Sequence, residues 1–358
     1  MKAVVLVGGE GTRLRPLTLS TPKQMLPIVG VPMIERVLGH LASHGIDEAV
    51  LSLGYLPAAF LEAYPDGRVA GMGLTYAVEP EPLDTAGAVR FAATFAGIEE
   101  TFVVVNGDVL TDLDLTALVA FHRRRGAEGT IALHPVADPS AFGVVPTDDD
   151  GRVVAFVEKP PRDEAPTNEI NAGTYVLEPS VLARIPEGGR VSIERETFPA
   201  MVRDGGLFAR SDDSYWLDTG TPAAFLEANF DYVNQKRGPI VNPEVVDRGD
   251  GVFLQGESDL EGAVTGPSVI LAGCVVESGA RVERSILGPG TVVSSGASVV
   301  DSVLMAGCHV AADAKVAGSV MGPRSIVGQR GDVRAISVLG ADAVVSSGTL
   351  VDGERVAG

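Results

Sequence analysis

The sequence predicts an α/β fold with a mostly parallel sheet, followed by a parallel β-helix. Three observations lead to this prediction. Apolar, strand-like runs alternate with helix-like stretches up to about residue 234. A stretch rich in Gly, Pro and Asp follows, and the rest of the chain repeats in steps of 17 or 18 residues. We therefore expect a first domain over 1–236, a linker leading into the second domain over 237–261, and a repeat domain over 262–358.

The composition is that of a folded, acidic protein. Of 358 residues, 45% are hydrophobic and 21% are charged, which argues against disorder, and the length exceeds what one ordinary core needs. A formal net charge of −19 makes nucleic acid and anionic membranes poor partners. Two cysteines give no disulfide framework, and no apolar run is long enough for a signal peptide or a membrane span. These features predict a cytoplasmic protein.

The first domain reads as successive βαβ units, which give parallel strands joined by right-handed crossovers. Its first strand runs directly into a glycine-rich segment. The glycines therefore follow the carboxyl end of a buried strand, where open α/β sheets bind ligands. Strands are expected over 3–7, 49–53, 74–78, 101–105, 130–133 and 153–157, and helices over 32–44, 86–95 and 114–125.

The segment over 6–23, LVGGEGTRLRPLTLSTPK, predicts a phosphate site. Gly8, Gly9 and Gly11 allow backbone amides to close on a phosphate chain. Arg13 and Lys23 supply the positive charge that a displaced pyrophosphate needs. The spacing fits neither a Rossmann fingerprint nor a Walker loop. The segment thus predicts a nucleoside triphosphate site of another type.

This segment and six later motifs resemble the sugar-1-phosphate nucleotidylyltransferases, also called nucleotide-sugar pyrophosphorylases. The resemblance covers about the first two-thirds of the chain. It implies a Rossmann-like nucleotidyltransferase domain that joins a nucleoside triphosphate to a sugar 1-phosphate and releases pyrophosphate. The motifs are EPLDTAG at 81–87, NGD at 106–108, FGVV at 142–145, FVEKP at 156–160, INAG at 170–173 and WLDTG at 216–220.

The resemblance also implies roles for individual residues. Arg13, Lys23 and Asp108 are the catalytic residues that it implies, and Asp108 and Asp218 are the implied magnesium ligands. The alternative for Asp218 is a helix cap before Thr221, and that for Asp108 is a turn. The implied nucleotide-binding residues are Gly8, Gly9, Gly11, Thr12, Arg13, Pro82, Asp84, Thr85 and Gly107. The implied sugar-phosphate-binding residues are Gly143, Glu158, Lys159 and Asn171.

The chemistry of this reaction explains the residue types. Both reactants are anions and the attacking phosphate oxygen is already ionised, so catalysis consists mainly of charge neutralisation and alignment. Mg²⁺ suits this task because it takes one or two carboxylates together with phosphate oxygens. Asp108 follows the strand over 101–105 and the turn Asn106-Gly107, so its carboxylate is expected at the carboxyl end of a strand.

The motifs divide over the choice of nucleobase and sugar. TAG, NGD, INAG, SIERETFP at 192–199 and the appended repeat look most like the mannose-1-phosphate guanylyltransferases, which use GTP. The pair Lys23-Gln24 and the motif WLDTGT at 216–221 look like the glucose-1-phosphate thymidylyltransferases, so a thymidylyl- or uridylyltransferase stays the alternative. One departure affects this choice, because Asp84 stands where guanylyltransferases commonly have glycine.

The second domain shows a six-residue period. Small residues separate buried aliphatic positions, the hexapeptide pattern of a parallel β-helix with three sides per coil. We count five coils; the resemblance implies a left-handed winding, and the flat faces predict a homo-oligomer. The aliphatic positions are Ile270, Val276, Val282; Leu287, Val293, Val299; Leu304, Val310, Val316; Met321, Val327, Val333; and Leu339, Val345, Val351.

The repeat also bears on the cysteines and on other functions. Cys274 and Cys308 occupy one corner two coils apart, about 9–10 Å, so we expect free thiols.

Hexapeptide β-helices also occur in acyltransferases that use a histidine base, and here His309 is the sole histidine after residue 262. A non-catalytic sugar-nucleotide sensor is the third class, distinguished from an enzyme by the absence of pyrophosphate release.

Overall fold

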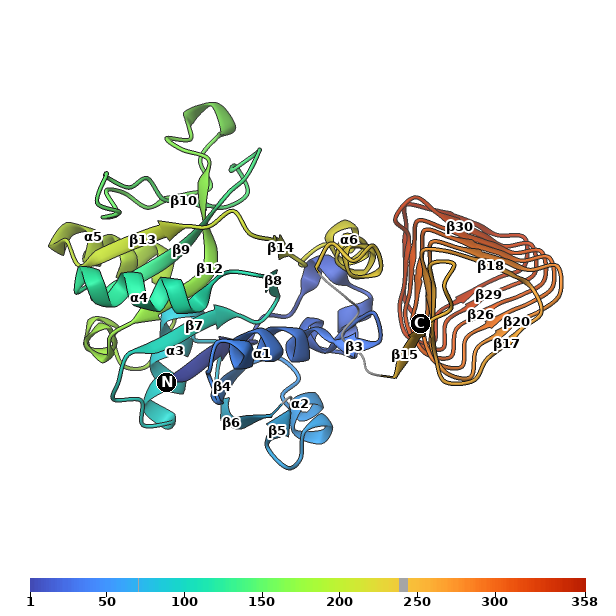
Figure 1. The fold of residues 1–358 in the computed structure, drawn as a ribbon, viewed down its shortest axis with the longest axis horizontal. Coiled ribbons are helices and arrows are strands. Elements are labelled where there is room, and N and C mark those ends of the chain that lie inside the picture. Colours follow the sequence, from blue (N-terminus) through green and yellow to red (C-terminus); the bar gives the residue numbers. More distant parts are fainter. Residues whose placement is uncertain (70, 238–243) are drawn as a thin grey trace. The chain divides into compact units, whose positions relative to one another are not determined.

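The computed structural model describes residues 1–69, 71–237 and 244–358, and Figure 1 shows its fold. The chain packs into two compact units. The first consists of residues 1–9 and 34–217, and the second of residues 10–33 and 218–358. The segment over 10–33 therefore packs with the C-terminal part of the chain. The boundaries at 236 and 262 stay a prediction, and residues 238–243 of the expected linker lie outside the described residues.

The first unit is built on one mixed sheet with the strand order β11-β10-β12-β7-β1-β4-β6-β5, and β9 joins β12 to β13. β7, β1, β4 and β6 run parallel, whereas β12 is antiparallel to β7. This confirms the α/β prediction with a mainly parallel centre. The strands are β1 (Lys2–Leu6), β4 (Glu48–Leu53), β5 (Arg68–Val69), β6 (Met72–Val78), β7 (Phe102–Asn106), β9 (Gly129–Pro135), β10 (Gly143–Val144), β11 (Val157–Glu158), β12 (Glu169–Leu177) and β13 (Leu207–Ser211).

Helices pack on this sheet where the sequence predicts them. α3 contacts β1, β4 and β6, whereas α4 contacts β9, β12 and β13. The side chain of Asp114 accepts a hydrogen bond from the backbone N–H of Ala117 and caps α4, which ends at Gly126. The helices are α1 (Met33–Ser43), α2 (Ala58–Ala63), α3 (Asp84–Phe95), α4 (Leu115–Arg125), α5 (Phe198–Asp204) and α6 (Pro222–Val233). None of the described helices is long and apolar enough to cross a membrane.

Short elements connect these strands and helices. The 3₁₀ turns are η1 (Thr12–Leu14), η2 (Leu17–Leu19), η3 (Lys23–Met25), η4 (Arg162–Glu164) and η5 (Pro179–Arg184), and η6 (Ile193–Thr197) is a π-helical turn. The short strands β2 (Pro27–Ile28) and β3 (Val31–Pro32) pair with each other, as do β8 (Val109–Thr111) and β14 (Trp216–Asp218).

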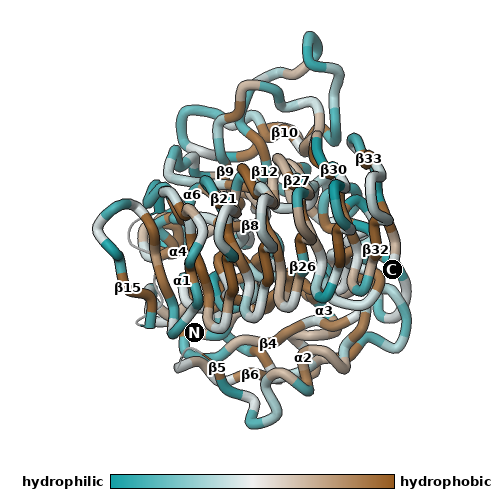
Figure 2. Tube along the Cα trace, turned by 90° about the vertical axis from the view of Figure 1, so that its right-hand side faces the viewer, coloured by the Kyte–Doolittle hydropathy of each residue, from teal (hydrophilic) through white to brown (hydrophobic). Residues whose placement is uncertain are grey.

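The second unit contains a β-helix of stacked parallel strands (Figures 1 and 2). This architecture is consistent with the left-handed winding that the resemblance implies. We name its faces after their first coil strands. The β16 face holds β16 (Val252–Gln255), β19 (Ser268–Ile270), β22 (Ile286–Leu287), β25 (Val303–Leu304), β28 (Val320–Met321), β31 (Val338–Leu339) and β34 (Arg355–Val356), with β15 (Val245–Asp247) antiparallel at its edge. The β17 face holds β17 (Asp259–Leu260), β20 (Val275–Val276), β23 (Val292–Val293), β26 (His309–Val310), β29 (Ile326–Val327) and β32 (Val344–Val345). The β18 face holds β18 (Ala263–Thr265), β21 (Arg281–Glu283), β24 (Ser298–Val300), β27 (Lys315–Ala317), β30 (Asp332–Arg334) and β33 (Leu350–Asp352).

The repeat register is confirmed. All fifteen aliphatic positions are at most 4% exposed and form one core. The structure adds a coil before the five counted from the sequence, because β16, β17 and β18 pair in parallel with the next coil. The six-residue pattern did not reveal this coil, because its core positions Leu260 and Val264 are only four residues apart.

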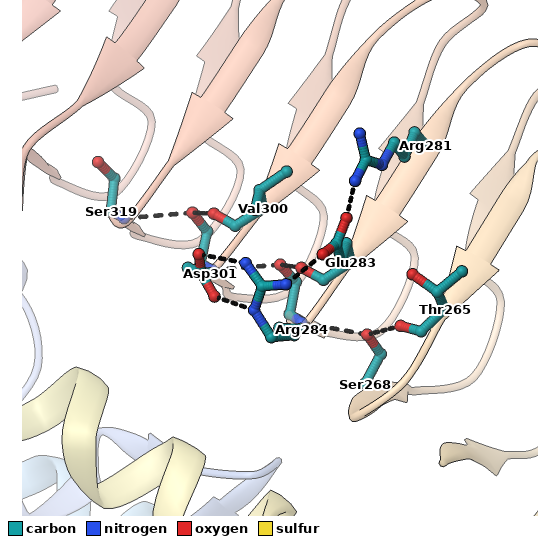
Figure 3. Close-up of polar contacts among 10 residues, drawn as sticks. Thr265, Ser268, Arg281, Glu283, Arg284, Val300, Asp301 and Ser319 are labelled. Atoms are coloured by element: carbon teal, nitrogen blue, oxygen red, sulfur yellow. Dashed lines mark hydrogen bonds and ion pairs between the residues drawn. The ribbon is translucent and has the colours of Figure 1, made fainter. Parts of the chain in front are cut away.

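A column of buried serines joins successive coils at one corner (Figure 3). The Oγ of Ser302 donates to the carbonyl of Val300 in its own turn and accepts the backbone N–H of Ser319 from the next coil. The same pattern links Ser268 to Ser285 and Ser285 to Ser302. Beside the column, the guanidinium of Arg284 pairs with both carboxylate oxygens of Asp301 at 2.7 and 2.8 Å.

Ser302→Ala is expected to destabilise the protein by about 1–3 kcal/mol, because it leaves the buried N–H of Ser319 without its partner. Ser298→Ala, four residues earlier and outside this column, is the matched control. Urea denaturation followed by circular dichroism measures both. If both variants lose the same free energy of unfolding, the serine column contributes no more to stability than a serine outside it.

Both cysteines are free, as predicted, and the structure shows that both are buried. Their sulfur atoms lie 3.2 Å from the carbonyl oxygens of Gly288 and Gly322, respectively. Burial raises the pKa of Cys308 to about 11, so this thiol stays protonated at neutral pH.

Candidate active site

In the second unit, the phosphate segment folds around Gly11. Gly11 has a φ of 62°, which favours glycine, and its carbonyl accepts hydrogen bonds from Thr18 Oγ1 and Leu14 N, both at 2.9 Å. A Cβ on Gly11 would lie 3.2 Å from the Cβ of Lys23. η1 begins directly after Gly11 and carries Thr12 and Arg13, which are exposed. The fold thus packs Lys23 against Gly11, and Arg13 follows two residues later on η1.

Arg13 also meets the predicted metal ligand of this unit. Its Nη2 lies 3.6 Å from Asp218 Oδ2, and Asp218 Oδ1 accepts the N–H of Gly220 at 2.8 Å. A Cβ on Gly220 would lie 2.3 Å from Arg13 Nη2, so a side chain there would displace the guanidinium. The side chain of Thr221 caps α6, which excludes a capping role for Asp218.

In the first unit, glycines bring the carboxyl ends of the central strands together. The N–H of Gly107 donates to the carbonyl of Leu6 at 2.9 Å, and a Cβ on Gly107 would lie 2.6 Å from Val7 Cγ1. Asp108 follows Gly107 and so stands at the carboxyl end of β7, as predicted. Among the described residues no heavy atom lies within 4 Å of a Cβ built on Gly9, which leaves space beside the loop.

Glu79 is a residue that the sequence reasoning missed. It follows β6, and its two carboxylate oxygens accept hydrogen bonds from Ser52 Oγ at 2.9 Å and Leu83 N at 3.2 Å. A Cβ on Gly8 would lie 3.2 Å from Glu79 Oε1. The carboxylate therefore lies between the glycine loop and the start of α3. The sequence does carry a signal for Glu79, because this residue directly follows the strand expected over 74–78. Asp108 has a similar position, three residues after the strand expected over 101–105.

The start of α3 explains the unusual residue at position 84. Asp84 has a φ of 59°, and its Oδ1 accepts the N–H of Thr85 at 2.8 Å. Glycine adopts this left-handed conformation most easily, and aspartate is one of the few other residues that tolerate it. The backbone conformation thus accounts for the glycine that guanylyltransferases commonly have here. Pro82 is exposed just before this turn.

The side chain of Thr85 connects the start of α3 to η6 through hydrogen bonds. Its Oγ1 accepts the N–H of Ile193 and donates to Glu194 Oε2, both at 2.8 Å. Ser192 Oγ also donates to Glu194 Oε2, at 2.9 Å. The hydroxyl of Thr85 is thus engaged within the protein, and its role in nucleotide binding stays a prediction.

Gly143, Glu158 and Lys159 lie together at the β10–β11 pair. Gly143 pairs with Glu158, and a Cβ on Gly143 would lie 2.7 Å from the ring of Phe156. Lys159 Nζ lies 3.6 Å from Glu158 Oε1. The φ of Lys159 is 50°, a strained conformation of the kind that collects at binding sites. The strand expected over 153–157 is wrong in extent, because its partner β10 offers two residues and only Val157–Glu158 pair with it.

Asn171 completes this group from β12. Its Nδ2 donates to the hydroxyl of Tyr175 at 2.9 Å and its Oδ1 accepts the N–H of Gly173 at 3.0 Å, beside a register shift in β12. Burial raises the pKa of Tyr175, and the negative charges of Glu194 and Glu158 raise it further. The sequence did not single out Tyr175, whose hydroxyl bonds to Asn171 and is influenced by the charges of Glu158 and Glu194.

Trp216 forms an aromatic wall beside this group. Its Nε1 donates to the carbonyl of Ala172 at 2.9 Å. The indole stacks on His134 with ring centres 5.5 Å apart and meets Phe142 edge-on, also at 5.5 Å. The carbonyl of Phe142 accepts the N–H of Lys159. The wall thus stands directly against the strand end that carries Lys159.

The two carboxylates that the resemblance implies as magnesium ligands are of the kind that this ion takes. No group of three or more His, Cys, Asp or Glu side chains among the described residues is arranged to hold a metal. Mg²⁺ does not require such a group, because it keeps water and takes phosphate oxygens beside one or two carboxylates. Asp108 in the first unit and Asp218 in the second are carboxylates of this kind.

Comparison with known proteins identifies the two parts of the chain. Residues 2–235 match the family described as nucleotidyl transferase, and residues 264–358 match that described as GMPPB C-terminal domain. A mannose-1-phosphate guanylyltransferase of Mycobacterium tuberculosis is 44% identical over 294 residues, which are 81% of this chain and 77% of that protein. Mannose-1-phosphate guanylyltransferase 1 of Arabidopsis thaliana is 36% identical over 356 residues, covering 97% of this chain and 92% of that protein.

Solved structures agree with these matches. The crystal structure of HddC from Yersinia pseudotuberculosis aligns with a TM-score of 0.56 and 28% identity, over 64% of this chain and 97% of that one. HddC has also been crystallised in complex with GMP-PN. With family matches over both parts and relatives aligned over most of the chain, this protein belongs to the nucleotidyl transferase family and carries a C-terminal domain of the GMPPB type.

Proposed function

We propose that this enzyme transfers the GMP moiety of GTP to mannose 1-phosphate and forms GDP-mannose and pyrophosphate. Relatives named mannose-1-phosphate guanylyltransferase, aligned over up to 97% of the chain, favour this reading over a thymidylyl- or uridylyltransferase. The observation that carries the choice of base is the carboxylate of Glu79 between the glycine loop and α3.

Glu79 suits guanine better than a pyrimidine. The Watson–Crick edge of guanine presents two neighbouring donors, N1–H and the N2 amino group, which a carboxylate accepts together. Thymine and uracil present one N–H between two carbonyl oxygens, so one oxygen would face the carboxylate without a donor. An unpaired polar contact of this kind costs about 1–3 kcal/mol when buried.

The mechanism that we propose depends on charge. Arg13 and Lys23 neutralise the triphosphate and the departing pyrophosphate, while Lys159 binds the phosphate of the sugar, whose ionised oxygen attacks the α-phosphorus in line. Asn171 and Glu158 bind sugar hydroxyls, and Trp216 shields the sugar from water. The resemblance implies Asp108 and Asp218 as ligands of Mg²⁺, which when bound would neutralise phosphate charge.

Lys159→Ala is expected to raise the KM for the sugar 1-phosphate at least about tenfold, since one charge-assisted contact to phosphate is lost. The KM for the triphosphate should stay near the wild-type value. Lys236→Ala, which removes a lysine paired with Asp231, is the charge-matched control. Initial-rate kinetics with each substrate varied in turn measure both constants. An equal rise in both KM values would remove Lys159 from the sugar site.

Pyrophosphate release tests the reaction class. Release that requires both a nucleoside triphosphate and a sugar 1-phosphate is expected, with a nucleotide sugar formed in equal amount. Binding of both substrates without release would identify a sensor instead. Turnover of acetyl-coenzyme A would identify an acyltransferase.

We propose further that the protein acts in the cytoplasm as a homo-oligomer assembled through the β-helix. Two outward-facing apolar residues on the β17 face, Ile326 and Val344, are 37% and 61% exposed and pair across neighbouring coils. Their exposure supports an interface. Light scattering at micromolar concentration tests it, and a monomer would contradict the proposal.

A further inference from the structure

Residues 10–33, which include the phosphate segment from Glu10 onward, belong to the same compact unit as the β-helix. Near the first coils, a Cβ on Gly30 would lie 2.5 Å from Leu271 Cδ1. Near the last coils, a Cβ on Gly340 would lie 3.0 Å from Pro16 Cβ. The segment over 10–33 therefore contacts the β-helix at two places that are four coils apart in the stack.

The outer surface of the β16 face is shielded from solvent along its length. Its outward-facing residues alternate with the core positions and are at most 2% exposed, although they point away from the β-helix interior. The β17 face differs, because its outward residues Ile326 and Val344 are exposed. The contacts of Gly30 and Gly340 place the segment over 10–33 against the β16 face. The covered residues are Val269, Ile286, Val303, Val320 and Val338.

Arg355 makes the most specific of these contacts. It lies in β34, in the last coil, and its Nη1 donates to the backbone carbonyl of Arg15 at 2.5 Å. Arg15 is the C-terminal cap of η1, two residues after Arg13, and its own guanidinium pairs with Glu10 at 2.7 Å. Arg355 thus holds the end of the turn that presents Arg13.

We propose that the last coil of the β-helix positions the phosphate-binding turn, with Arg355 as the positioning residue. The Arg355–Arg15 hydrogen bond and the Gly340–Pro16 contact fix the end of η1, and thereby the direction in which Arg13 points. Arg355 touches no reacting atom in this scheme. The kinetic consequence rests on the proposed function, whereas the order of the turn itself does not.

Hydrogen exchange and kinetics test this proposal together. The N–H groups of Leu14 and Arg15 are bonded inside the turn to Gly11 O and Thr12 O, so they report its order. In Arg355→Ala their exchange is expected to speed up roughly tenfold, the effect of losing about one hydrogen bond. The kcat should fall roughly tenfold with the KM for sugar 1-phosphate unchanged. Arg355→Lys should restore part of both. Lys315→Ala, an exposed cation on the β18 face, is the charge-matched control.

Gly340→Ala is the second variant and keeps the test valid if Arg355→Ala unfolds the last coil. Its methyl would press on Pro16 from the preceding coil, and it is expected to speed exchange of the same two amides. Wild-type exchange in both variants would overturn the proposal. Faster exchange with wild-type kcat would overturn it too, because the turn would then not need to be held. If the wild-type enzyme releases no pyrophosphate, the proposed function fails while the exchange result still decides whether the contact orders the turn.

Discussion

Asp108→Asn is expected to lower kcat at least about 100-fold while leaving the fold intact. Asp108 stands at the carboxyl end of β7, directly after Gly107, whose packing against Val7 sets the position of the turn. The reaction that we propose joins two anions, and removing one preorganised charge from such a transition state costs about 3 kcal/mol. Pyrophosphate release at saturating substrates measures the loss.

Asp114→Asn is the matched control for this variant. It makes the same chemical change in the same unit, and asparagine caps a helix as well as aspartate does, so α4 should keep its N-terminus. Its kcat should equal that of the wild type. A near-normal rate in folded Asp108→Asn protein supplied with magnesium would remove Asp108 from the active site.

Glu79→Gln is expected to lower kcat/KM for GTP about 100-fold. The amide keeps one acceptor, but its NH₂ group faces one of the two guanine donors, which leaves a buried polar group unpaired. The kcat/KM for UTP or dTTP should not fall, because their N–H needs only the remaining acceptor. The ratio of kcat/KM for GTP to kcat/KM for UTP or dTTP should therefore fall about 100-fold.

The control for this experiment is Glu81→Gln, two residues further along and exposed. It changes the charge of the same segment equally and should keep the preference for GTP. A parallel fall for purine and pyrimidine triphosphates in Glu79→Gln would show that Glu79 only supports the loop, through its hydrogen bonds to Ser52 and Leu83.

The fold was predictable wherever a local period governs burial. The six-residue spacing of aliphatic residues predicted fifteen core positions in five coils, because each coil buries its aliphatic side chains on those of the next. The preceding coil was not predictable, since the four-residue interval from Leu260 to Val264 breaks the period. The strand expected over 153–157 was wrong in extent for a different reason. An apolar run can pair only along the length of its partner strand, and β10 is two residues long.

The candidate site was predictable in part. Residues directly after central strands, such as Gly8 and Asp108, could be placed because parallel strands end at one edge of the sheet. Glu194 and Tyr175 could not, because their positions come from tertiary contacts. Glu194 meets Thr85 across 109 residues of chain, and Tyr175 meets Asn171 at a register shift in β12 that no periodicity reveals. The contact of Arg355 with Arg15, 340 residues apart, has no local signal at all.

The most direct measurement is a panel of GTP, dTTP, UTP, ATP and CTP against mannose 1-phosphate and glucose 1-phosphate, with kcat/KM obtained from pyrophosphate release. GTP with mannose 1-phosphate should exceed every other pair by more than about tenfold, because the wrong base leaves polar groups of the pocket unpaired. If dTTP or UTP with glucose 1-phosphate leads by that margin, the guanylyltransferase proposal is wrong, and Glu79 reads a different base edge.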